Sequence, residues 1–231
     1  MVTQLPHPGT RAPLSRTVLR TAAAAALWLA TLACLAMATA DAQEATIYFL
    51  TAKAGQQDVG GSLFKTLAAN HGPLRDAKTV TREGFDFDIY AVTRHHYGLA
   101  IGIDLMDYDQ TFHFQGLSGV QTPEQLRLQA RSILYTLMGF LRFGDFLPFV
   151  GLGTGTYYVH YNEKVSGLSF ADAAADVFAY RAGFRWLMVG RWGLLVEVGQ
   201  IDAPLRVLSN NVSSTLDLGG GFYNVGLSYV W

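Results

Sequence analysis

Cysteine is almost absent from this sequence. Its single cysteine, Cys34, lies inside an apolar N-terminal run, so the chain beyond that run has no thiol for a disulfide or a redox site. Charge is also scarce, because charged residues make up 15% of the chain and the formal net charge is -1. Such a chain has no excess of positive charge that would attract the phosphates of a nucleic acid. The composition therefore excludes thiol redox chemistry and argues against nucleic-acid binding.

Long apolar runs are also missing after residue 43, where no stretch approaches the roughly 18 residues that a membrane-spanning helix needs. Glycine is plentiful, with 24 residues, and aromatic residues reach 13%. This mixture is typical of tightly packed, twisted strands, although a soluble β-sandwich would share it. The length of 231 residues predicts one domain of ordinary size.

Residues 1–42 have the composition of a signal peptide. Arginines precede an apolar run over residues 21–38 that contains no charge. Small residues then offer cleavage after Ala40 or after Ala42, and we favour the second site. An uncleaved membrane anchor and a lipoprotein modified at Cys34 are the alternatives.

Beyond this segment, apolar and small or polar residues alternate with a period of two. Residues 223–231 are the clearest case, because one face is apolar throughout and the other is mostly small or polar. The apolar face consists of Tyr223, Val225, Leu227, Tyr229 and Trp231. The remaining predicted strands lie within 48–53, 85–92, 99–106, 128–143, 150–158, 178–186 and 194–199. Both faces of 128–143 are largely apolar, so its orientation is left open.

The connections between these strands alternate in length. The long ones run over about 55–84, 107–127, 161–175 and 202–215, and the short ones lie near 94–97, 144–147 and 189–191. Eight strands with every long loop at one end are typical of membrane barrels. The sequence therefore predicts an all-β fold, an eight-stranded antiparallel up-and-down transmembrane β-barrel.

The last strand, GFYNVGLSYVW, resembles the C-terminal assembly signal of outer-membrane barrels, although the chain ends in Trp231 where Phe is commonest. The segments PFVGLGTGTYY and FAYRAGFRW resemble strands of small OmpA-type and OmpX-type barrels. The resemblance covers the whole predicted mature domain, 43–231. It implies a place in the outer membrane of a Gram-negative cell, contact with outer-membrane lipid and lipopolysaccharide, and assembly by the barrel-assembly machinery.

Several charged residues fall on faces that would point into the barrel lumen, where a charge must be paired. If Trp186 and Trp192 face each other across their short turn, Arg181 lies opposite Glu197. The sequence thus predicts an ion pair between Arg181 and Glu197. The predicted lumen network comprises Lys53, Asp86, Asp88, Asp104, Arg181, Arg185 and Glu197. Such a network either plugs the barrel or gates an ion path.

The histidines of the mature chain form no motif that indicates catalysis or metal binding. None is followed two residues later by serine, as in membrane lipid A deacylases. His95 and His96 are neighbours beside a short turn, so their side chains would point apart and not share a metal. A long loop could still bring His71 or His113 near an aspartate. No catalytic residue, metal or cofactor is predicted.

The first long loop mixes charges with Leu63, Phe64 and Leu67 at helix-like spacing. Loops carry binding in scaffolds of this kind, so this loop is a candidate for contact with lipopolysaccharide, host or partner protein. The sequence therefore favours a structural or surface-interaction role. A lipid-modifying hydrolase and a small-solute channel are the competing hypotheses.

Overall fold

The computed structural model describes residues 43–60, 65, 72–76, 78–93, 96–115, 124–163, 169–209 and 212–231. The predicted signal peptide and the loop residues at helix-like spacing, Leu63, Phe64 and Leu67, lie outside these residues. Among the described residues, no helix has the length and hydrophobicity that crossing a membrane requires.

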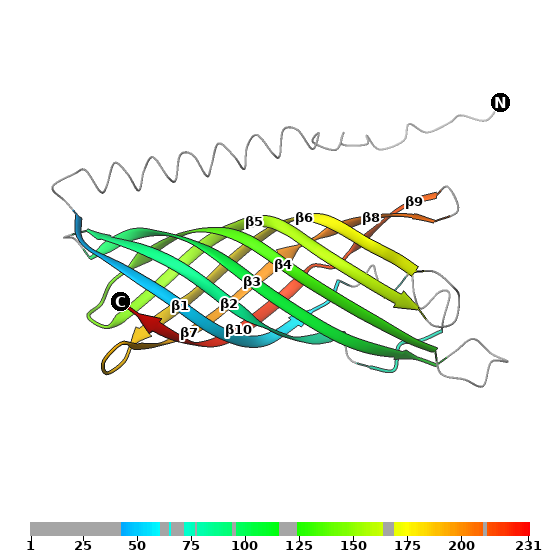
Figure 1. Cartoon of the computed structure of the whole chain (residues 1–231), viewed down its shortest axis with the longest axis horizontal. Helices are drawn as coiled ribbons and strands as arrows, with labels where there is room; N and C mark the ends of the chain where they lie inside the picture. Colours follow the sequence, from blue (N-terminus) through cyan, green and yellow to red (C-terminus); the bar gives the residue numbers. More distant parts are fainter. Residues whose placement is uncertain are drawn as a thin grey trace, which may run out of the picture.

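Eight of the ten described strands close into an antiparallel barrel (Figure 1). Their order around the barrel is β1-β10-β7-β6-β5-β4-β3-β2, so neighbours in the chain are neighbours in the wall. The strands are β1 Gln43–Asp58, β2 Thr79–Thr93, β3 Tyr97–Phe114, β4 Glu124–Leu141, β5 Phe146–Glu163, β6 Ser169–Leu187, β7 Trp192–Asp202, β8 Pro204–Ser209, β9 Val212–Asp217 and β10 Gly220–Val230. The predicted eight-stranded up-and-down barrel is confirmed.

The long connection predicted over about 202–215 lies between β7 and β10, and it has a regular structure that the sequence did not predict. It contains β8 and β9, which pair with each other as a separate two-stranded hairpin between β7 and β10. Leu205, at the base of this hairpin, is buried with the interior side chains of the barrel. Figure 1 shows the hairpin projecting from one end of the barrel.

The two ends of the barrel differ. At one end, which we call the short-turn end, β1 begins, β10 finishes and three short turns join the strands (Figure 1). Gly144 and Gly190 occupy two of these turns with positive φ of 63° and 77°, a backbone conformation that glycine adopts at no steric cost. The opposite end, which we call the long-loop end, carries the longer connections and the β8–β9 hairpin.

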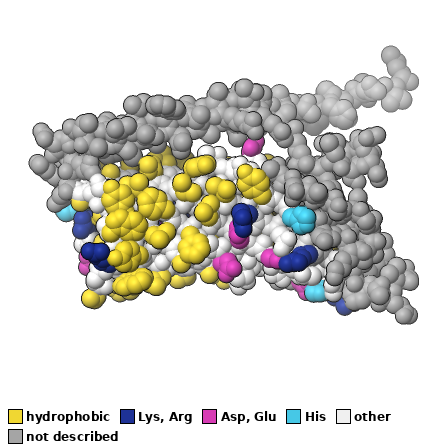
Figure 2. Space-filling model, viewed as in Figure 1, with side chains coloured by type: hydrophobic (Ala, Val, Ile, Leu, Met, Phe, Trp, Pro, Cys, Tyr) yellow, Lys and Arg dark blue, Asp and Glu magenta, His cyan; other side chains and the backbone are white. Residues whose placement is uncertain are grey.

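A band of apolar side chains, which we call the apolar belt, covers the outside of the barrel next to the short-turn end. Figure 2 shows these side chains gathered on one part of the wall, with charged side chains beyond them. On β3 the belt runs from Tyr97 to Leu105, close to the nine or so residues with which a tilted strand crosses hydrocarbon. Its members include Leu50, Phe85, Phe87, Ile103, Tyr135, Val150, Leu152, Phe178, Tyr180, Trp186, Trp192, Val198, Tyr223, Val225, Leu227, Tyr229 and Trp231.

Several strands continue well past the belt, farther than the sequence predicted. On β3 the outward positions after Leu105 are Asp107 and Asp109, whereas Tyr108 and Phe112 point inward and are buried. The alternation therefore inverts, with polar residues outside and apolar residues inside. The strand predicted over 99–106 therefore ends where the inversion begins, because the prediction followed the outward apolar face.

The same inversion explains β4, whose orientation the sequence left open. Near the short-turn end, Tyr135 and Leu141 face outward in the belt. Near the long-loop end, Leu128 and Leu134 are buried inside the barrel. Met138 and Phe140 are also buried inside the barrel, so both faces of β4 are apolar near the short-turn end, whereas mainly the inward face is apolar near the long-loop end.

Candidate functional site

The seven residues predicted for the lumen all lie inside the barrel, at the level of the apolar belt. They come from β1, β2, β3, β6 and β7, and each has a relative exposure of 6% or less. Because inward positions repeat every second residue, these strands deliver the charged side chains to one common layer. We call this layer the charged layer; it contains Lys53, Asp86, Asp88, Asp104, Arg181, Arg185 and Glu197.

Lys53 lies between three carboxylates. Its Nζ is 2.7 Å from Oε1 of Glu197, 2.9 Å from Oδ2 of Asp104 and 3.4 Å from Oδ2 of Asp86. The ammonium has three donors, and three acceptors surround it. The side chain is fully buried, so these ion pairs compensate for the water that it loses.

Arg181 and Glu197 are paired, although not in the predicted register. The structure sets Arg181 opposite Gly199, because Trp186 pairs with Leu194 and not with Trp192. The predicted register is therefore wrong by two residues. Arg181 nevertheless reaches Glu197 diagonally, with Nη1 3.1 Å from Oε2.

Arg185 forms ion pairs and hydrogen bonds with a second group of residues in the interior. It contacts the carboxylates of Asp86 and Asp88, and its Nη2 is 3.0 Å from Oδ1 of Asp86. Its Nη1 donates to the hydroxyls of Thr51 at 2.6 Å and Ser228 at 2.9 Å. The planar guanidinium uses its donors in several directions at once, which a lysine in its place could not do.

Some members of this network were missed by sequence reasoning. Asn224 donates to Glu197 over 2.7 Å, and Tyr90 accepts from Nε of Arg185 over 3.1 Å. These uncharged polar residues occupy inward positions on their strands, and that placement was the signal that could have identified them. Arg82 was missed because its segment was predicted as loop. Its Nη1 donates to Gln57 over 2.8 Å.

Arg82 completes the charge balance of the interior. Four buried cations, namely Lys53, Arg82, Arg181 and Arg185, match four buried carboxylates among the described residues. An unbalanced charge inside a narrow barrel would cost several kcal/mol. The buried charges of the interior thus sum to zero. This balance favours a network that closes the barrel over one that conducts ions.

Apolar side chains close the interior on both sides of the charged layer. Toward the short-turn end lie Phe49, Tyr90 and Phe140, packed in one buried cluster with the ring of Tyr90 4.9 Å from that of Phe49. Toward the long-loop end a second buried cluster includes Phe112 and Leu128. In the described part of the chain, therefore, the charged layer lies between two apolar plugs.

The C-terminal strand closes the barrel against β1. Trp231 and Tyr48 exchange backbone hydrogen bonds of 3.1 and 3.2 Å, and their rings stack with centroids 5.9 Å apart. Tyr223, Val225 and the other predicted members of this face point outward, between 37% and 50% exposed. The residues of the predicted assembly signal thus form one apolar stripe that ends at the short-turn end.

Among the described residues, the histidines lie apart from the charged layer. His113 does approach an aspartate, since its Nδ1 is 2.8 Å from Oδ2 of Asp76, and its backbone N–H donates to the same oxygen over 2.6 Å. This pair is partly exposed and fastens residues 72–76 to the end of β3. His71 and His95 are outside the described residues, within which no group of three metal-ligating side chains was found.

No protein-family model matches this sequence, and no curated protein matches it significantly. Solved structures that are similar include Ail of Yersinia pestis, with 13% identity and a TM-score of 0.48, covering 82% of this chain and 100% of that one. OprG of Pseudomonas aeruginosa has 11% identity and a TM-score of 0.45, covering 82% and 98%. Neisserial surface protein A has 14% identity and a TM-score of 0.40, covering 80% and 99%. The barrel assignment rests on the hydrogen-bonded strand order of this chain.

Proposed function

We propose that this chain is an integral outer-membrane barrel with a closed lumen, which acts as a structural or surface-interaction protein through its long-loop end. The observation that carries the proposal is the layering of the barrel. An apolar belt lies outside. The buried charged layer lies inside, between two apolar clusters, and Arg82 elsewhere in the interior balances its one surplus carboxylate. A wall of this kind suits a lipid bilayer, in which every backbone polar group of a closed barrel is satisfied.

The outer wall beyond the belt supports a role at a surface. There Asp107 pairs with Arg131 at 2.9 Å, and Asp109 accepts from Arg127 at 2.9 Å and from Gln129 at 2.7 Å. These side chains are exposed, and they form a polar collar where the barrel would leave the membrane. The collar and the connections above it are the parts that other molecules would meet.

The orientation follows from the predicted export. With a signal peptide at 1–42, the mature chain would reach the periplasm and enter the outer membrane from that side. The short turns would then stay in the periplasm and the long-loop end would face outward. Contact with lipopolysaccharide and insertion by the barrel-assembly machinery belong to the same proposal.

Gel mobility tests the barrel itself. The protein extracted from outer-membrane fractions in mild detergent should migrate differently before and after boiling, because a closed barrel resists the detergent until heated. Recovery of the protein in the soluble periplasmic fraction, with no change in mobility, would contradict the proposal.

Single cysteines test the orientation, since the predicted mature chain contains none. Thr81→Cys places a thiol on the outer wall near the long-loop end, and Asp145→Cys places one in a short turn. A maleimide that cannot cross membranes should label Thr81→Cys on intact cells and Asp145→Cys only after permeabilisation. The reverse pattern would overturn the orientation.

The two competing functions find less support. A channel needs a water-filled path, whereas the two apolar plugs fill the described interior on both sides of the charged layer. A hydrolase needs an activated nucleophile, and the His113–Asp76 pair instead holds a loop segment against β3. We therefore propose neither a channel nor a hydrolase.

A further inference from the structure

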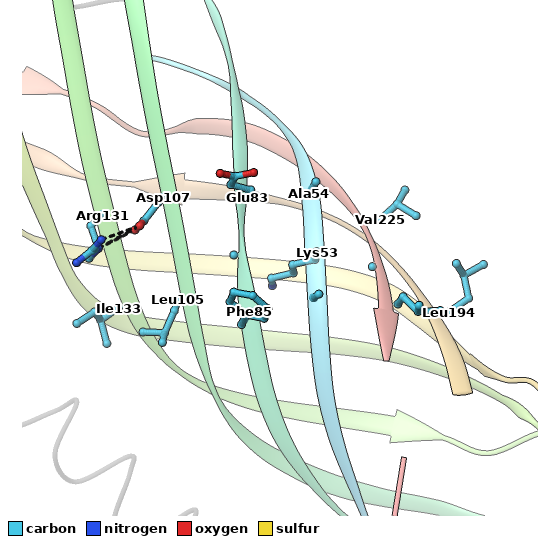
Figure 3. A pocket seen from close by; sticks show the side chains of 14 residues that line it. Lys53, Ala54, Glu83, Phe85, Leu105, Asp107, Arg131, Ile133, Leu194 and Val225 are labelled. Carbon is cyan, nitrogen blue, oxygen red and sulfur yellow. Dashed lines mark hydrogen bonds and ion pairs between the residues drawn. The ribbon is translucent and has the colours of Figure 1, made fainter. Parts of the chain in front are cut away.

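Two exposed arginines at opposite ends of the outer wall differ in their partners. At the polar collar, Arg131 is paired with the carboxylate of Asp107 at 2.9 Å (Figure 3). At the short-turn end, Nη1 of Arg191 donates to an uncharged group, the hydroxyl of Tyr229, over 3.1 Å. Among the described residues, no carboxylate pairs with Arg191. Its positive charge is therefore left for another molecule to balance.

Arg191 is fixed beside β10 by two contacts. Its backbone carbonyl accepts from the N–H of Val230 over 2.8 Å, and its side chain bonds to Tyr229, the preceding residue of the same strand. Both contacts join the turn between β6 and β7 to the end of the last strand. The remaining donors of the guanidinium are thus held near one place, so less conformational freedom is lost when they bind an acceptor.

Three aromatic rings lie next to this guanidinium. Trp192 packs edge-on against Tyr229 with ring centroids 5.7 Å apart, and the ring of Trp231 lies 5.9 Å from that of Tyr229. All three residues are between 37% and 49% exposed. Tryptophan and tyrosine are typical of the level at which lipid headgroups meet the hydrocarbon, so Arg191 lies at headgroup level. We call Arg191, Trp192, Tyr229 and Trp231 the arginine-aromatic site.

The wall between this site and the long-loop end is aliphatic. Leu194 lies opposite Leu227, and Val196 lies opposite Val225, on the outward faces of β7 and β10. Leu227 and Val225 are each 49% exposed. From the short-turn end upward, the surface thus presents a cation, three rings and an aliphatic strip. An anionic headgroup joined to acyl chains has the complementary order.

The charges at the short-turn end also favour an anionic headgroup. The described side chains of the short turns include two arginines, Arg142 and Arg191, together with the carboxylate of Asp145. Arg142 donates to the carbonyl of Gly144 within its own turn, over 3.2 Å. A cation beside Arg191 would be repelled, whereas a phosphate would accept from its guanidinium. In the proposed orientation this end lies in the periplasmic leaflet, which consists of phospholipid, whereas lipopolysaccharide occupies the other leaflet.

We propose that the arginine-aromatic site binds an anionic phospholipid of the phosphatidylglycerol type. The phosphate contacts Arg191, and the rings of Trp192 and Trp231 contact the glycerol backbone. The acyl chains lie along Leu194 and Leu227. This inference rests on the proposed membrane residence and orientation. Phosphatidylethanolamine has the same phosphate, but its ammonium would lie close to the guanidinium, so it is held less well.

The test uses the full chain, extracted from membranes and reconstituted in vesicles of equal parts phosphatidylglycerol and phosphatidylethanolamine. Native mass spectrometry after mild extraction then counts the retained lipids. The wild type should retain phosphatidylglycerol in preference. Arg191→Gln should reduce that preference about threefold to fivefold, the effect of one exposed charge-assisted contact, and Arg191→Lys should keep most of it. Arg131→Gln, the same change at the paired arginine of the collar, should leave it unchanged.

Tryptophan fluorescence gives a second readout that needs no extraction. The sequence has four tryptophans, of which Trp28 lies in the predicted signal peptide. Two of the other three, Trp192 and Trp231, belong to the arginine-aromatic site. Brominated acyl chains quench the fluorescence of rings that they touch. Brominated phosphatidylglycerol should therefore quench the wild type more than brominated phosphatidylethanolamine does, and the two lipids should quench Arg191→Gln equally.

The outcomes separate the two proposals. If the wild type shows no heat-dependent mobility, the membrane proposal and the lipid-site proposal both fail. If it is heat-modifiable but retains the two phospholipids equally, or if Arg191→Gln and Arg131→Gln have the same effect, only the lipid-site proposal fails. Lipopolysaccharide added to the vesicles provides the last arm. Displacement of phosphatidylglycerol by lipopolysaccharide, with the same dependence on Arg191, would overturn the proposal by identifying a different occupant.

Discussion

Arg181 and Glu197 form a diagonal ion pair across two neighbouring strands, with Nη1 3.1 Å from Oε2, although each lies directly opposite a glycine. Gly199 faces Arg181, and Gly183 faces Glu197. A Cβ at Gly199 would lie 2.6 Å from Cζ of Phe222, and one at Gly183 would lie 3.0 Å from Cζ of Phe149, so aromatic rings use the space beside both glycines. The narrow interior is thereby filled by side chains that do not lie opposite each other in the ladder.

The first prediction concerns the carboxylate of Glu197, which accepts from Lys53, Arg181 and Asn224. Glu197→Gln leaves two buried cations with one partner fewer. We expect a loss of about 3 kcal/mol or more in the free energy of unfolding, since breaking a buried ion pair leaves a charge uncompensated. Urea unfolding of the barrel in lipid vesicles measures it.

Glu83→Gln is the matched control, because it makes the same chemical change on the outer wall. There the side chain is exposed, and the expected change in the free energy of unfolding is within about 0.5 kcal/mol. Equal effects of the two variants would show that the charged layer contributes nothing specific to stability.

The second prediction concerns the geometry of Arg185. Arg185→Lys keeps the charge but cannot reach Asp86, Thr51 and Ser228 together, so hydroxyls and a carboxylate lose their donors. We expect a loss of about 2 kcal/mol or more in the free energy of unfolding.

The exposed Arg131→Lys is the comparison, with an expected change of less than about 1 kcal/mol. The same unfolding titration serves for both variants. If Arg185→Lys proved as mild as Arg131→Lys, the interior would have to be wet enough for water to replace the lost contacts.

Period-two alternation was enough to predict the eight strands of the barrel and the members of the charged layer, although it missed β8 and β9. The inward direction of Lys53, Asp104 and Arg181 follows from this alternation, because the side chains of a strand point alternately to its two faces. The register of the β6–β7 hairpin does not follow. Trp192 was taken as the partner of Trp186, yet it packs edge-on against Tyr229 of β10, 5.7 Å away. A tryptophan girdle marks the level of a membrane and leaves the pairing of strands undetermined.

Strand length could not be predicted for a different reason. Beyond the belt the environment outside the barrel changes from apolar to polar, while the interior remains apolar. Arg82, on the extension of β2, therefore looked like a loop residue, although it is buried and contacts Gln57 and the ring of Phe222. A single sequence does not indicate at which residue the environment outside the barrel wall changes from apolar to polar.

The third prediction tests whether the final strand acts as an assembly signal. Trp231→Ser removes the last aromatic residue of the stripe and its stacking on Tyr48. We expect the yield of folded, heat-modifiable protein in outer-membrane fractions to fall severalfold, because assembly would fail before stability matters. Trp231→Phe should restore the yield.

Trp186→Ser is the control for a general effect of the aromatic girdle. Trp186 is 52% exposed and Trp231 is 49% exposed, so the two side chains present similar apolar surface. If the C-terminal strand is an assembly signal, Trp231→Ser lowers the yield of folded protein and Trp186→Ser lowers it much less. Equal losses would indicate that both residues act only as membrane-interface anchors.

The last prediction concerns His96, the one described residue other than glycine with a positive φ, at 61°. Its backbone is fixed there, because its N–H donates to Thr93 over 3.1 Å and its carbonyl accepts from Arg142 over 2.6 Å. A β-branched side chain is strained in this conformation, so His96→Val should cost about 1–2 kcal/mol in the free energy of unfolding. His96→Asn should be neutral or slightly stabilising, since asparagine tolerates it. Asp145→Val, in another short turn without positive φ, provides the comparison in the same unfolding assay. If both valine variants cost the same, the loss would reflect valine in an exposed turn, and the left-handed backbone at His96 would not be the cause.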